Sequence, residues 1–317
     1  MSHKHITPIQ RNELSVLIQA RVKQKDIARI LSKDRSTIYR ERKRNSKGDG
    51  KYHARIAKRQ TKERRVRANQ RFRKIENNLP LKKKIVGMIQ RYWSPEEISG
   101  NLLNQIGKDS IYNFIYNERI DLIKYLRCAK GKFRRRRGTG LRIKERKKME
   151  NKRNIGNRPL VVETRERLGD WEGDTVVSLG NKGSVLLTIN ERKSGYVLIS
   201  KIKGRKSELV LKETKKRFKR IPNSKKRTVT YDNGSEFAEY EMIEKETGMN
   251  VFFANPYHPW ERGSNENING LIRQFFPKKT NFDNVSEKEI KKVERLLNNR
   301  PRKRLNYLTP KEVFLNS

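Results

Sequence analysis

Three acidic residues stand in contexts that suit chemistry on phosphate esters. Asp174 lies in the β-branched run DWEGDTVV, Asp232 ends the run RTVTYD, and Glu266 is the single acid in the basic stretch RGSNENINGLIRQFFPKK. Three carboxylates brought close together repel one another unless a cation is bound between them. Two Mg²⁺ ions, which prefer oxygen ligands, would activate the attacking oxygen and stabilise the leaving one. These residues are therefore candidate catalytic and metal-binding groups, with Mn²⁺ expected to substitute for Mg²⁺.

The segments around these acids predict strands and helices in the order of a ribonuclease-H-like domain. GDWEGDTVVSL, GSVLLTIN and GYVLIS predict three strands, and the amphipathic stretch SELVLKETKKRFKRI predicts a helix. RTVTYDNG then predicts a strand, EFAEYEMIEKETG a helix and NVFFAN a fifth strand. If the first and fourth strands are neighbours, Asp174 and Asp232 lie side by side. We therefore expect a multidomain fold, with N-terminal all-α helix-turn-helix units followed by an α/β ribonuclease-H-like catalytic domain that has a mixed five-stranded sheet.

The basic stretch that contains Glu266 predicts the last helix of this domain. Ser264 is its expected N-cap, and Pro277 ends it. Glu266 then lies in the first turn, where the helix dipole favours an anion, and the helix carries it across the two aspartates. The same stretch offers basic side chains that could grip phosphate, namely Arg262, Arg273, Lys278 and Lys279.

Four other acids lie close to the three candidates in the sequence. Strand alternation turns Glu172 to the same face as Asp174, so Glu172 is a second candidate ligand. Asp170 is expected to be a strand-entry residue, and Glu236 flanks Asp232. Glu261 precedes the last helix and is expected to point away from the site.

The charge of the chain indicates a polyanionic partner. Its 317 residues include 78 Lys and Arg against 35 Asp and Glu, so the formal net charge is 78 − 35 = +43. An enzyme for small molecules gains nothing from that much self-repulsion, whereas DNA or RNA neutralises it and releases counterions on binding. We therefore expect binding to double-stranded DNA that depends steeply on salt.

The cysteine and histidine content excludes two kinds of site. One Cys cannot form an internal disulfide, and one Cys with four scattered His cannot build a Cys/His zinc module, so any metal must be held by oxygen. No apolar run approaches the roughly 18 to 20 residues of a membrane span, so no membrane partner is expected.

The first 45 residues predict a helix-turn-helix. Ile27, Ala28, Ile30 and Leu31 form one apolar stripe, and after the polar break SKDRS a second helix starts with Ile38. Ala28 allows the helices to cross closely, and Ser32 stands where many such turns have Gly. The second helix offers five residues to a DNA groove: Arg35, Ser36, Thr37, Tyr39 and Arg40. An ordinary helical hairpin is the alternative.

A second, looser copy of this unit follows. In WSPEEISGNLLNQIGKDSIYNFIYNE, Ile98 and Ser99 correspond to Ile27 and Ala28, and the turn is two residues longer. Lys108 is a further candidate DNA contact. The next segment, KGKFRRRRGTGLRIKERKK, is too basic to fold alone and should order on phosphate, with contacts from Arg134, Arg135, Arg136 and Arg137.

These segments divide the chain into six expected parts. They are a first helix-turn-helix unit (1–50), a basic helical connector (51–75), a second helix-turn-helix-like unit (76–128), a basic linker (129–160), the ribonuclease-H-like catalytic core (161–280) and a C-terminal helical tail (281–317).

Several motifs together resemble a known family. DWEGDTVV, TYDNGSEF and PWERGSNENINGLIRQFFPKKTNF resemble the three catalytic blocks of insertion-sequence transposases of the "IS thirty" family, within the DDE transposase and retroviral-integrase-like superfamily. STIYRERKRN, WSPEEISGNL and NNRPRKRLNYLTP resemble its other blocks, so the likeness covers nearly the whole chain. It implies that Asp174, Asp232 and Glu266 are the catalytic triad, with 33 residues between the last two.

The resemblance implies a bacterial transposase that binds the terminal inverted repeats of its element and target DNA. It would act in the cytoplasm at the nucleoid, as a dimer or larger assembly, and perform Mg²⁺-dependent strand cleavage and strand transfer. Two alternatives remain open: a DNA-binding regulator with an inactive nuclease domain, and a ribonuclease-H-type nuclease.

Overall fold

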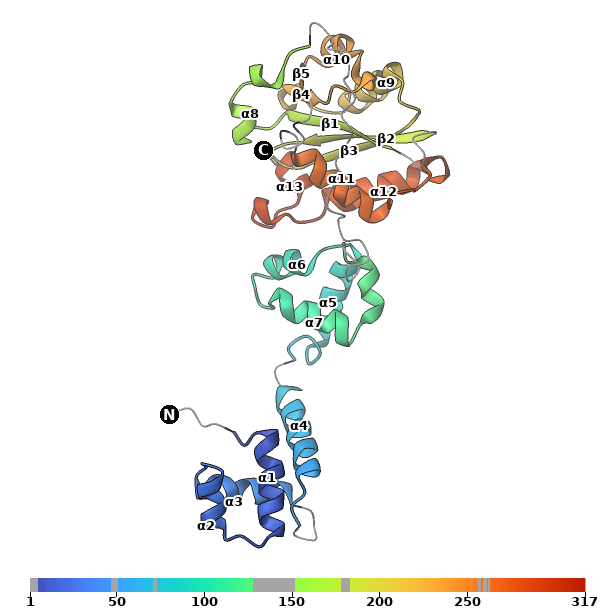
Figure 1. Ribbon diagram of the computed structural model, residues 1–317. Coiled ribbons are helices and arrows are strands. Elements are labelled where there is room, and N and C mark those ends of the chain that lie inside the picture. The colour runs from blue at the N-terminus through green and yellow to red at the C-terminus, as the bar shows by residue number, and fades with distance from the viewer. Residues whose placement is uncertain are drawn as a thin grey trace. The chain divides into compact units, whose positions relative to one another are not determined.

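The computed structural model describes residues 5–46, 51–70, 73–127, 152–177, 183–255, 258, 261 and 263–316 (Figure 1). The chain divides into two compact units, Met1–Leu79 and Pro80–Ser317. No helix in the described ranges has both the length and the apolar character needed to cross a bilayer. The predicted basic segment with Arg134, Arg135, Arg136 and Arg137 lies outside the described residues, as does Arg262.

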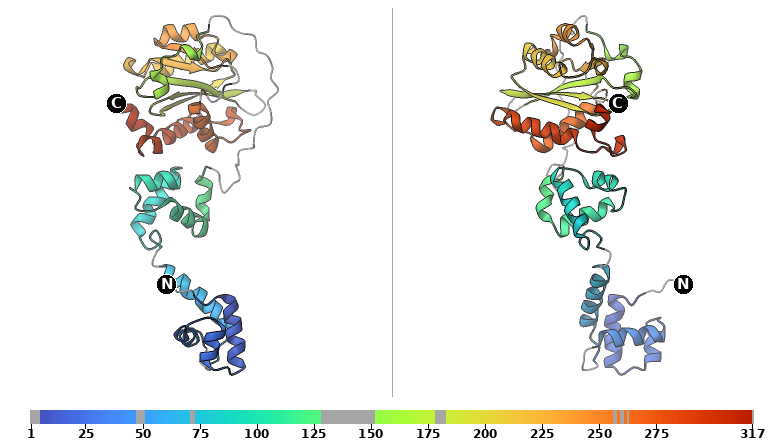
Figure 2. Two further views of the ribbon diagram at one scale, coloured as in Figure 1. Left: turned by 60° about the vertical axis from the view of Figure 1, so that its left-hand side comes forward. Right: turned by 180° about the vertical axis from the view of Figure 1, so that it is seen from behind.

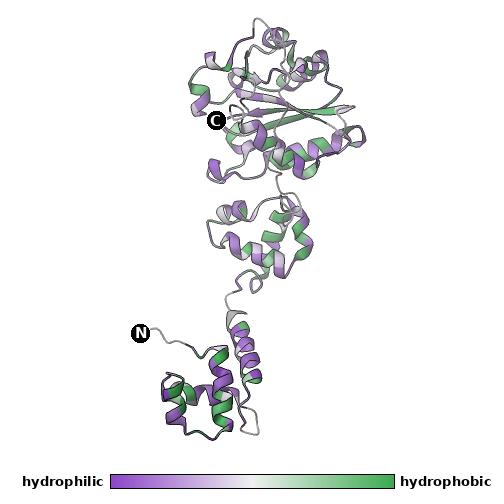
Figure 3. Ribbon diagram, viewed as in Figure 1, coloured by the Kyte–Doolittle hydropathy of each residue, from purple (hydrophilic) through white to green (hydrophobic). Residues whose placement is uncertain are grey.

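The first unit contains four α-helices: α1 (Pro8–Gln19), α2 (Gln24–Ile30), α3 (Arg35–Asn45) and α4 (Ala54–Gln70). The predicted helix pair corresponds to α2 and α3, whose inner faces bury Ile27, Ala28 and Ile38 against α1. The expected stripe is wrong at Ile30, which is 59% exposed because it lies on the outer face of α2. Figure 3 shows that α4 is mostly hydrophilic along its length.

The turn between α2 and α3 explains how a serine replaces the usual glycine. Ser32 has φ +49°, in the left-handed region that glycine tolerates best. Asp34 then caps α3 by accepting a 2.7 Å hydrogen bond from the backbone N–H of Ser36. The turn therefore has the geometry of a helix-turn-helix without its common residue.

The second unit begins with α5 (Leu79–Gln90), α6 (Pro95–Asn101), α7 (Lys108–Asn117) and the 3₁₀ helix η1 (Ile120–Tyr125). The predicted start of α6 is confirmed by a capping box between Ser94 and Glu97. Glu97 also forms a buried ion pair with Arg300 in the C-terminal segment, at 2.8 Å. This ion pair therefore links α6 to the segment that contains Arg300.

The sheet of the second unit has five strands: β1 (Asp170–Val176), β2 (Ser184–Glu191), β3 (Val197–Lys203), β4 (Thr228–Tyr231) and β5 (Asn250–Phe253). Their order is β3-β2-β1-β4-β5. The strands β1, β2 and β3 pair antiparallel, whereas β1–β4 and β4–β5 are parallel. The mixed five-stranded sheet is confirmed, with the first and fourth strands adjacent.

Helices cover both faces of this sheet (Figure 2). They are α8 (Val161–Thr164), α9 (Ser207–Phe218), α10 (Tyr240–Thr247), α11 (Gly263–Phe275), α12 (Glu287–Asn298) and α13 (Pro310–Leu315). On the face of the sheet that α9 and α10 cover, the core includes Trp171. On the face that α11 and α12 cover, the core includes Leu186. Because both faces are covered, all eight residues of β2 are buried.

Short 3₁₀ helices join these elements: η3 (Ile155–Asn157), η5 (Asn223–Lys225), η6 (Ser235–Phe237), η8 (Phe282–Asn284) and η9 (Lys303–Leu305). The predicted N-cap of the Glu266 helix, Ser264, is wrong. The helix α11 begins at Gly263, so Ser264 lies inside its first turn, where its hydroxyl accepts a hydrogen bond from Arg165.

Candidate active site

Asp174 and Asp232 belong to the two central, parallel strands. The register of β1 and β4 pairs Asp170 with Thr228, and Glu172 with Thr230. Asp174 lies two residues beyond Glu172 on β1, and Asp232 lies two residues beyond Thr230, directly after β4. The carboxyl ends of parallel strands meet at one edge of a sheet, which is where ligands commonly bind in α/β folds.

The helix α11 crosses this edge and contacts Asp174 directly. The Nδ2 atom of Asn269 donates a 2.7 Å hydrogen bond to Oδ2 of Asp174. Glu266 lies in the first turn of α11, three residues before Asn269. Glu266 is exposed. Because residues three apart on a helix are neighbours, Glu266 belongs to the same part of the helix as the Asp174 contact.

Glu236 is a fourth carboxylate near this edge, and it is almost fully buried. Its Oε1 accepts a 3.0 Å hydrogen bond from the hydroxyl of Thr175, whose backbone N–H donates to Asp174 at 2.8 Å. Arg205 forms an ion pair with it. Burial alone would raise the pKa of Glu236, but the hydrogen bonds and charge of Arg205 outweigh it and lower the pKa. Glu236 is therefore a buried acid that flanks Asp232 and is held by protein contacts.

Gly234 brings Asp232 and Glu236 together. A Cβ at Gly234 would lie 2.8 Å from Oδ1 of Asp232 and closer still to Oε2 of Glu236. The backbone N–H of Gly234 donates to Oδ1 of Asp232 at 3.0 Å. Only glycine fits between the two carboxylates, so the DNG sequence shapes a tight turn around them.

Lys152 is a cation beside these acids that the sequence did not indicate. Its Nζ is buried, has no hydrogen-bond partner and lies 4.0 Å from the centre of the Phe253 ring. Desolvation lowers the pKa of Lys152, and the charges of Asp232 and Glu236 oppose that shift. Lys152 thus supplies a positive charge close to the acidic edge.

The donor chemistry of this edge suits a hard divalent cation. Asp174, Asp232 and Glu236 offer carboxylate oxygens, the ligands that Mg²⁺ prefers. Across the described ranges, no three His, Cys, Asp or Glu side chains stand close enough together to form a metal site as they are. A cation held here would therefore have to draw carboxylate ligands together.

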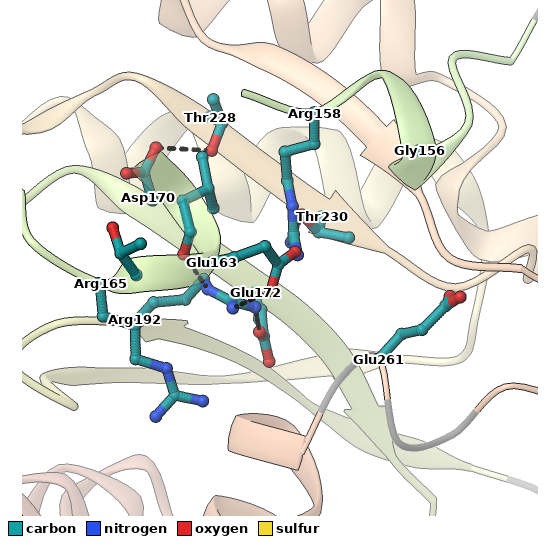
Figure 4. Close-up of polar contacts among 12 residues, drawn as sticks. Gly156, Arg158, Glu163, Arg165, Asp170, Glu172, Arg192, Thr228, Thr230 and Glu261 are labelled. Atoms are coloured by element: carbon teal, nitrogen blue, oxygen red, sulfur yellow. Dashed lines mark hydrogen bonds and ion pairs between the residues drawn. The ribbon is translucent and has the colours of Figure 1, made fainter. Parts of the chain in front are cut away.

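The other neighbouring acids are held by protein contacts (Figure 4). Glu172 is completely buried and ion-paired with Arg192, so the expectation that it is a second candidate ligand is not supported. Asp170 is the first residue of β1 and binds Arg167 at 2.8 Å. Glu261 accepts a 2.8 Å hydrogen bond from the backbone N–H of Asn255, so it too is held by a protein contact.

The candidate DNA contacts fall into two groups in the structure. Most are exposed, at the start of α3, at the start of α7 and after α11: Arg35, Ser36, Tyr39, Arg40, Lys108, Lys278 and Lys279. Thr37 is half-buried. Arg273 is also half-buried, and its guanidinium donates to the backbone oxygen of Val177 at 2.9 Å. Desolvation lowers the pKa of Arg273, and its hydrogen bond ties α11 to the segment after β1.

Comparison with known proteins agrees with this architecture. Residues 165–259 match the integrase core domain family. The chain is 38% identical to the transposase for insertion sequence element IS4351 of Bacteroides fragilis, over 98% of this chain and 95% of that protein. It is 33% identical to transposase InsI for insertion sequence element IS30A of Escherichia coli (strain K12), over 98% of this chain and 83% of that protein.

A third relative is the transposase for insertion sequence element IS1086 of Cupriavidus metallidurans, 31% identical over 98% of this chain and 94% of that protein. These similarities extend over both units, and the integrase core lies on the sheet that carries Asp174 and Asp232. The chain therefore belongs to the IS30 ("IS thirty") family of insertion-sequence transposases, which contain an integrase core domain.

Proposed function

We propose that this transposase binds the terminal inverted repeats of its insertion sequence and cleaves and joins DNA strands with Asp174, Asp232 and Glu266 as catalytic residues. The reaction is hydrolysis of a phosphodiester to expose a 3′-hydroxyl, followed by attack of that hydroxyl on a second strand. Both steps are displacements at phosphorus and differ only in the nucleophile.

The observation that carries the proposal is the arrangement of β1, β4 and α11. The pair Glu172–Thr230 of the β1–β4 register lies two residues before Asp174 and two residues before Asp232, and Asn269 of α11 donates a hydrogen bond to Asp174. The three acids are 58 and 34 residues apart in the chain (232 − 174 and 266 − 232). Elements that are distant in the sequence thus carry the acids to neighbouring parts of one domain, and this supports a shared role.

The chain's own groups orient the proposed ligands. Thr175 and Asn269 each donate a hydrogen bond to Asp174, one to each carboxylate oxygen. The backbone N–H of Gly234 donates a hydrogen bond to Oδ1 of Asp232. A bound pair of Mg²⁺ ions, for which Mn²⁺ would substitute, would activate the nucleophile and stabilise the leaving oxygen.

DNA recognition is assigned to the two helix pairs. The exposed residues of α3 suit base-edge contacts in the major groove, and Lys108 at the start of α7 suits the phosphates of a neighbouring segment. The net charge of +43 supports binding to both element ends and target DNA. Two ends must be joined, so we expect a dimer or larger assembly on DNA, at the bacterial nucleoid.

We propose a role for each of the expected parts of the chain. Residues 1–50 and 76–128 recognise DNA, 51–75 and 129–160 connect the parts and contact phosphate, 161–280 perform the chemistry, and 281–317 form the helical tail.

Incubating the purified protein with Mg²⁺ and either DNA that ends in its own inverted repeat or an RNA–DNA hybrid tests the proposal. We expect nicking at the repeat end and joining to a second DNA. Cleavage of the hybrid with no preference for the repeat would favour a ribonuclease. Binding to the repeat with no cleavage under any divalent cation would favour a regulator.

A further inference from the structure

A network of ion pairs lies behind the candidate site, formed by Arg158, Glu163, Glu172 and Arg192 (Figure 4). It contains two positive and two negative side chains and is therefore neutral. The side chains of Arg158, Glu172 and Arg192 are at most 4% exposed. Charges removed from water to this extent need close partners, and each member has one.

The first end of the network is on β1 and α11. Glu172 lies two residues before Asp174, is ion-paired with Arg192 and accepts a 3.3 Å hydrogen bond from the backbone N–H of Asn265. Asn265 is in the first turn of α11, where backbone N–H groups lack partners within the helix. The carboxylate therefore satisfies a free donor and complements the helix dipole, one residue before Glu266.

Two further contacts hold the same turn of α11. The side-chain amide of Asn265 donates to the backbone oxygen of Gly173 at 3.2 Å. The guanidinium of Arg165 donates to the hydroxyl of Ser264 at 3.1 Å. The start of the helix is thus fixed to β1 and to the segment after α8.

The second end of the network is on β4. Arg192 binds the backbone oxygen of Val162 and the carboxylate of Glu163, each at 3.1 Å. Glu163 is ion-paired with Arg158, whose Nη1 donates to the hydroxyl of Thr230 at 2.9 Å. Thr230 lies two residues before Asp232.

We infer that this ion-pair network positions the three candidate ligands relative to one another. It contacts β1 two residues before Asp174, β4 two residues before Asp232, and α11 one residue before Glu266. In this inference its members are positioning residues, which act on the candidate ligands through neighbouring residues of β1, β4 and α11. The inference rests on the proposed function and adds to it a set of residues that determine how readily the acids close on a divalent cation.

The discriminating variant is Glu172→Gln, which keeps the shape of the side chain and removes its charge. Glu294→Gln is the matched control, because Glu294 also binds one arginine (Arg217, 2.6 Å) and one backbone N–H (Ile199, 2.6 Å). It joins α9, α12 and β3, none of which carries a candidate ligand. Both variants should lower the thermal midpoint.

Two readouts separate positioning from general stability. The first is the Mg²⁺ or Ca²⁺ concentration that half-saturates the thermal stabilisation of the full-length protein without DNA. The second is the Mg²⁺ concentration for half-maximal nicking of the repeat end. Residues that orient metal ligands typically change affinity or activity about 10- to 100-fold. We expect Glu172→Gln to raise both concentrations at least about 10-fold on that basis and Glu294→Gln to leave both at the wild-type value.

Equal half-saturation in Glu172→Gln and wild type would overturn the inference, as would an equal rise in Glu294→Gln. A wild type that neither binds the cation nor nicks DNA would overturn the proposed function itself, which is a different result. If Glu172→Gln does not fold, Thr230→Val removes the neutral contact through which Arg158 of the network reaches β4. It must then raise both concentrations, and wild-type values there would also overturn the inference.

Discussion

Asn269 on α11 donates a 2.7 Å hydrogen bond to Asp174 on β1, across 95 residues of sequence. One turn earlier on the same helix lies Glu266. This hydrogen bond therefore orients the proposed ligand Asp174. It also holds α11, which carries the proposed ligand Glu266, against β1.

Replacing Asn269 with alanine should lower strand cleavage. The variant removes one of the contacts that orient the Asp174 carboxylate, and groups that orient metal ligands contribute about 10- to 100-fold to activity. Single-turnover nicking of a repeat end measures the change. Asn267→Ala on the exposed side of α11 is the control and should keep wild-type activity. Equal rates for both variants would show that the Asn269 contact has no catalytic role.

The Glu236–Arg205 pair should make the catalytic unit less stable in acid. The pKa of Glu236 is lower in the folded chain than its ordinary value of 4.5. Its contribution is therefore complete above that value and is lost as the pH falls through the lowered pKa. Denaturant midpoints between about pH 3 and pH 7 should show a steeper acid loss for wild type than for Glu236→Gln. Parallel curves would contradict this prediction.

Ser32→Gly should stabilise the first unit. A non-glycine residue in the left-handed region costs about 1–2 kcal/mol, and glycine loses about 0.5–1 kcal/mol in unfolded-state entropy, so the net gain is about 0.5–1 kcal/mol. Thermal unfolding of the full-length protein measures it. Ser32→Ala keeps the Cβ at φ +49° and should give no gain. A glycine variant no more stable than the alanine variant would rule out strain at this turn.

Arg35→Ala and Arg40→Ala on α3 should each weaken binding to the inverted repeat. If the side chain binds phosphate, the slope of log affinity against log salt falls by about 1; if it binds a base edge, discrimination between repeat and random DNA falls instead. Titration at several salt concentrations separates the two. Arg220→Ala makes the same charge change on an exposed site outside the helix pairs. Equal losses in all three variants would mean that α3 is not the recognition helix.

The sheet and the positions of its acids followed from local patterns. Short β-branched runs separated by turn residues predict strands whatever their neighbours, and the helix predicted from EFAEYEMIEKETG is α10, which Gly248 closes at φ +73°. Glu172 was harder. Alternation placed it correctly on the face of Asp174, but a pattern of period two does not show that Arg192 and the start of α11 converge on it.

Residues without a charge or a motif were not predicted at all. Asn265 and Asn269 are two amides among several in one helix, and only the packing of α11 on β1 distinguishes them. The sequence indicates only that Glu236 flanks Asp232, because its partner Arg205 is 31 residues away. Such contacts depend on tertiary structure, which local sequence patterns do not encode.

The most direct test of the catalytic assignment is a Mg²⁺-dependent strand-transfer assay on repeat-end DNA with Asp232→Asn and Glu266→Gln. Glu208→Gln, an exposed acid on α9, is the control for loss of one negative charge. We predict that both site variants bind the repeat with at least wild-type affinity and neither nick nor join DNA, while the control does all three. Nicking by either site variant at the wild-type rate would contradict the account.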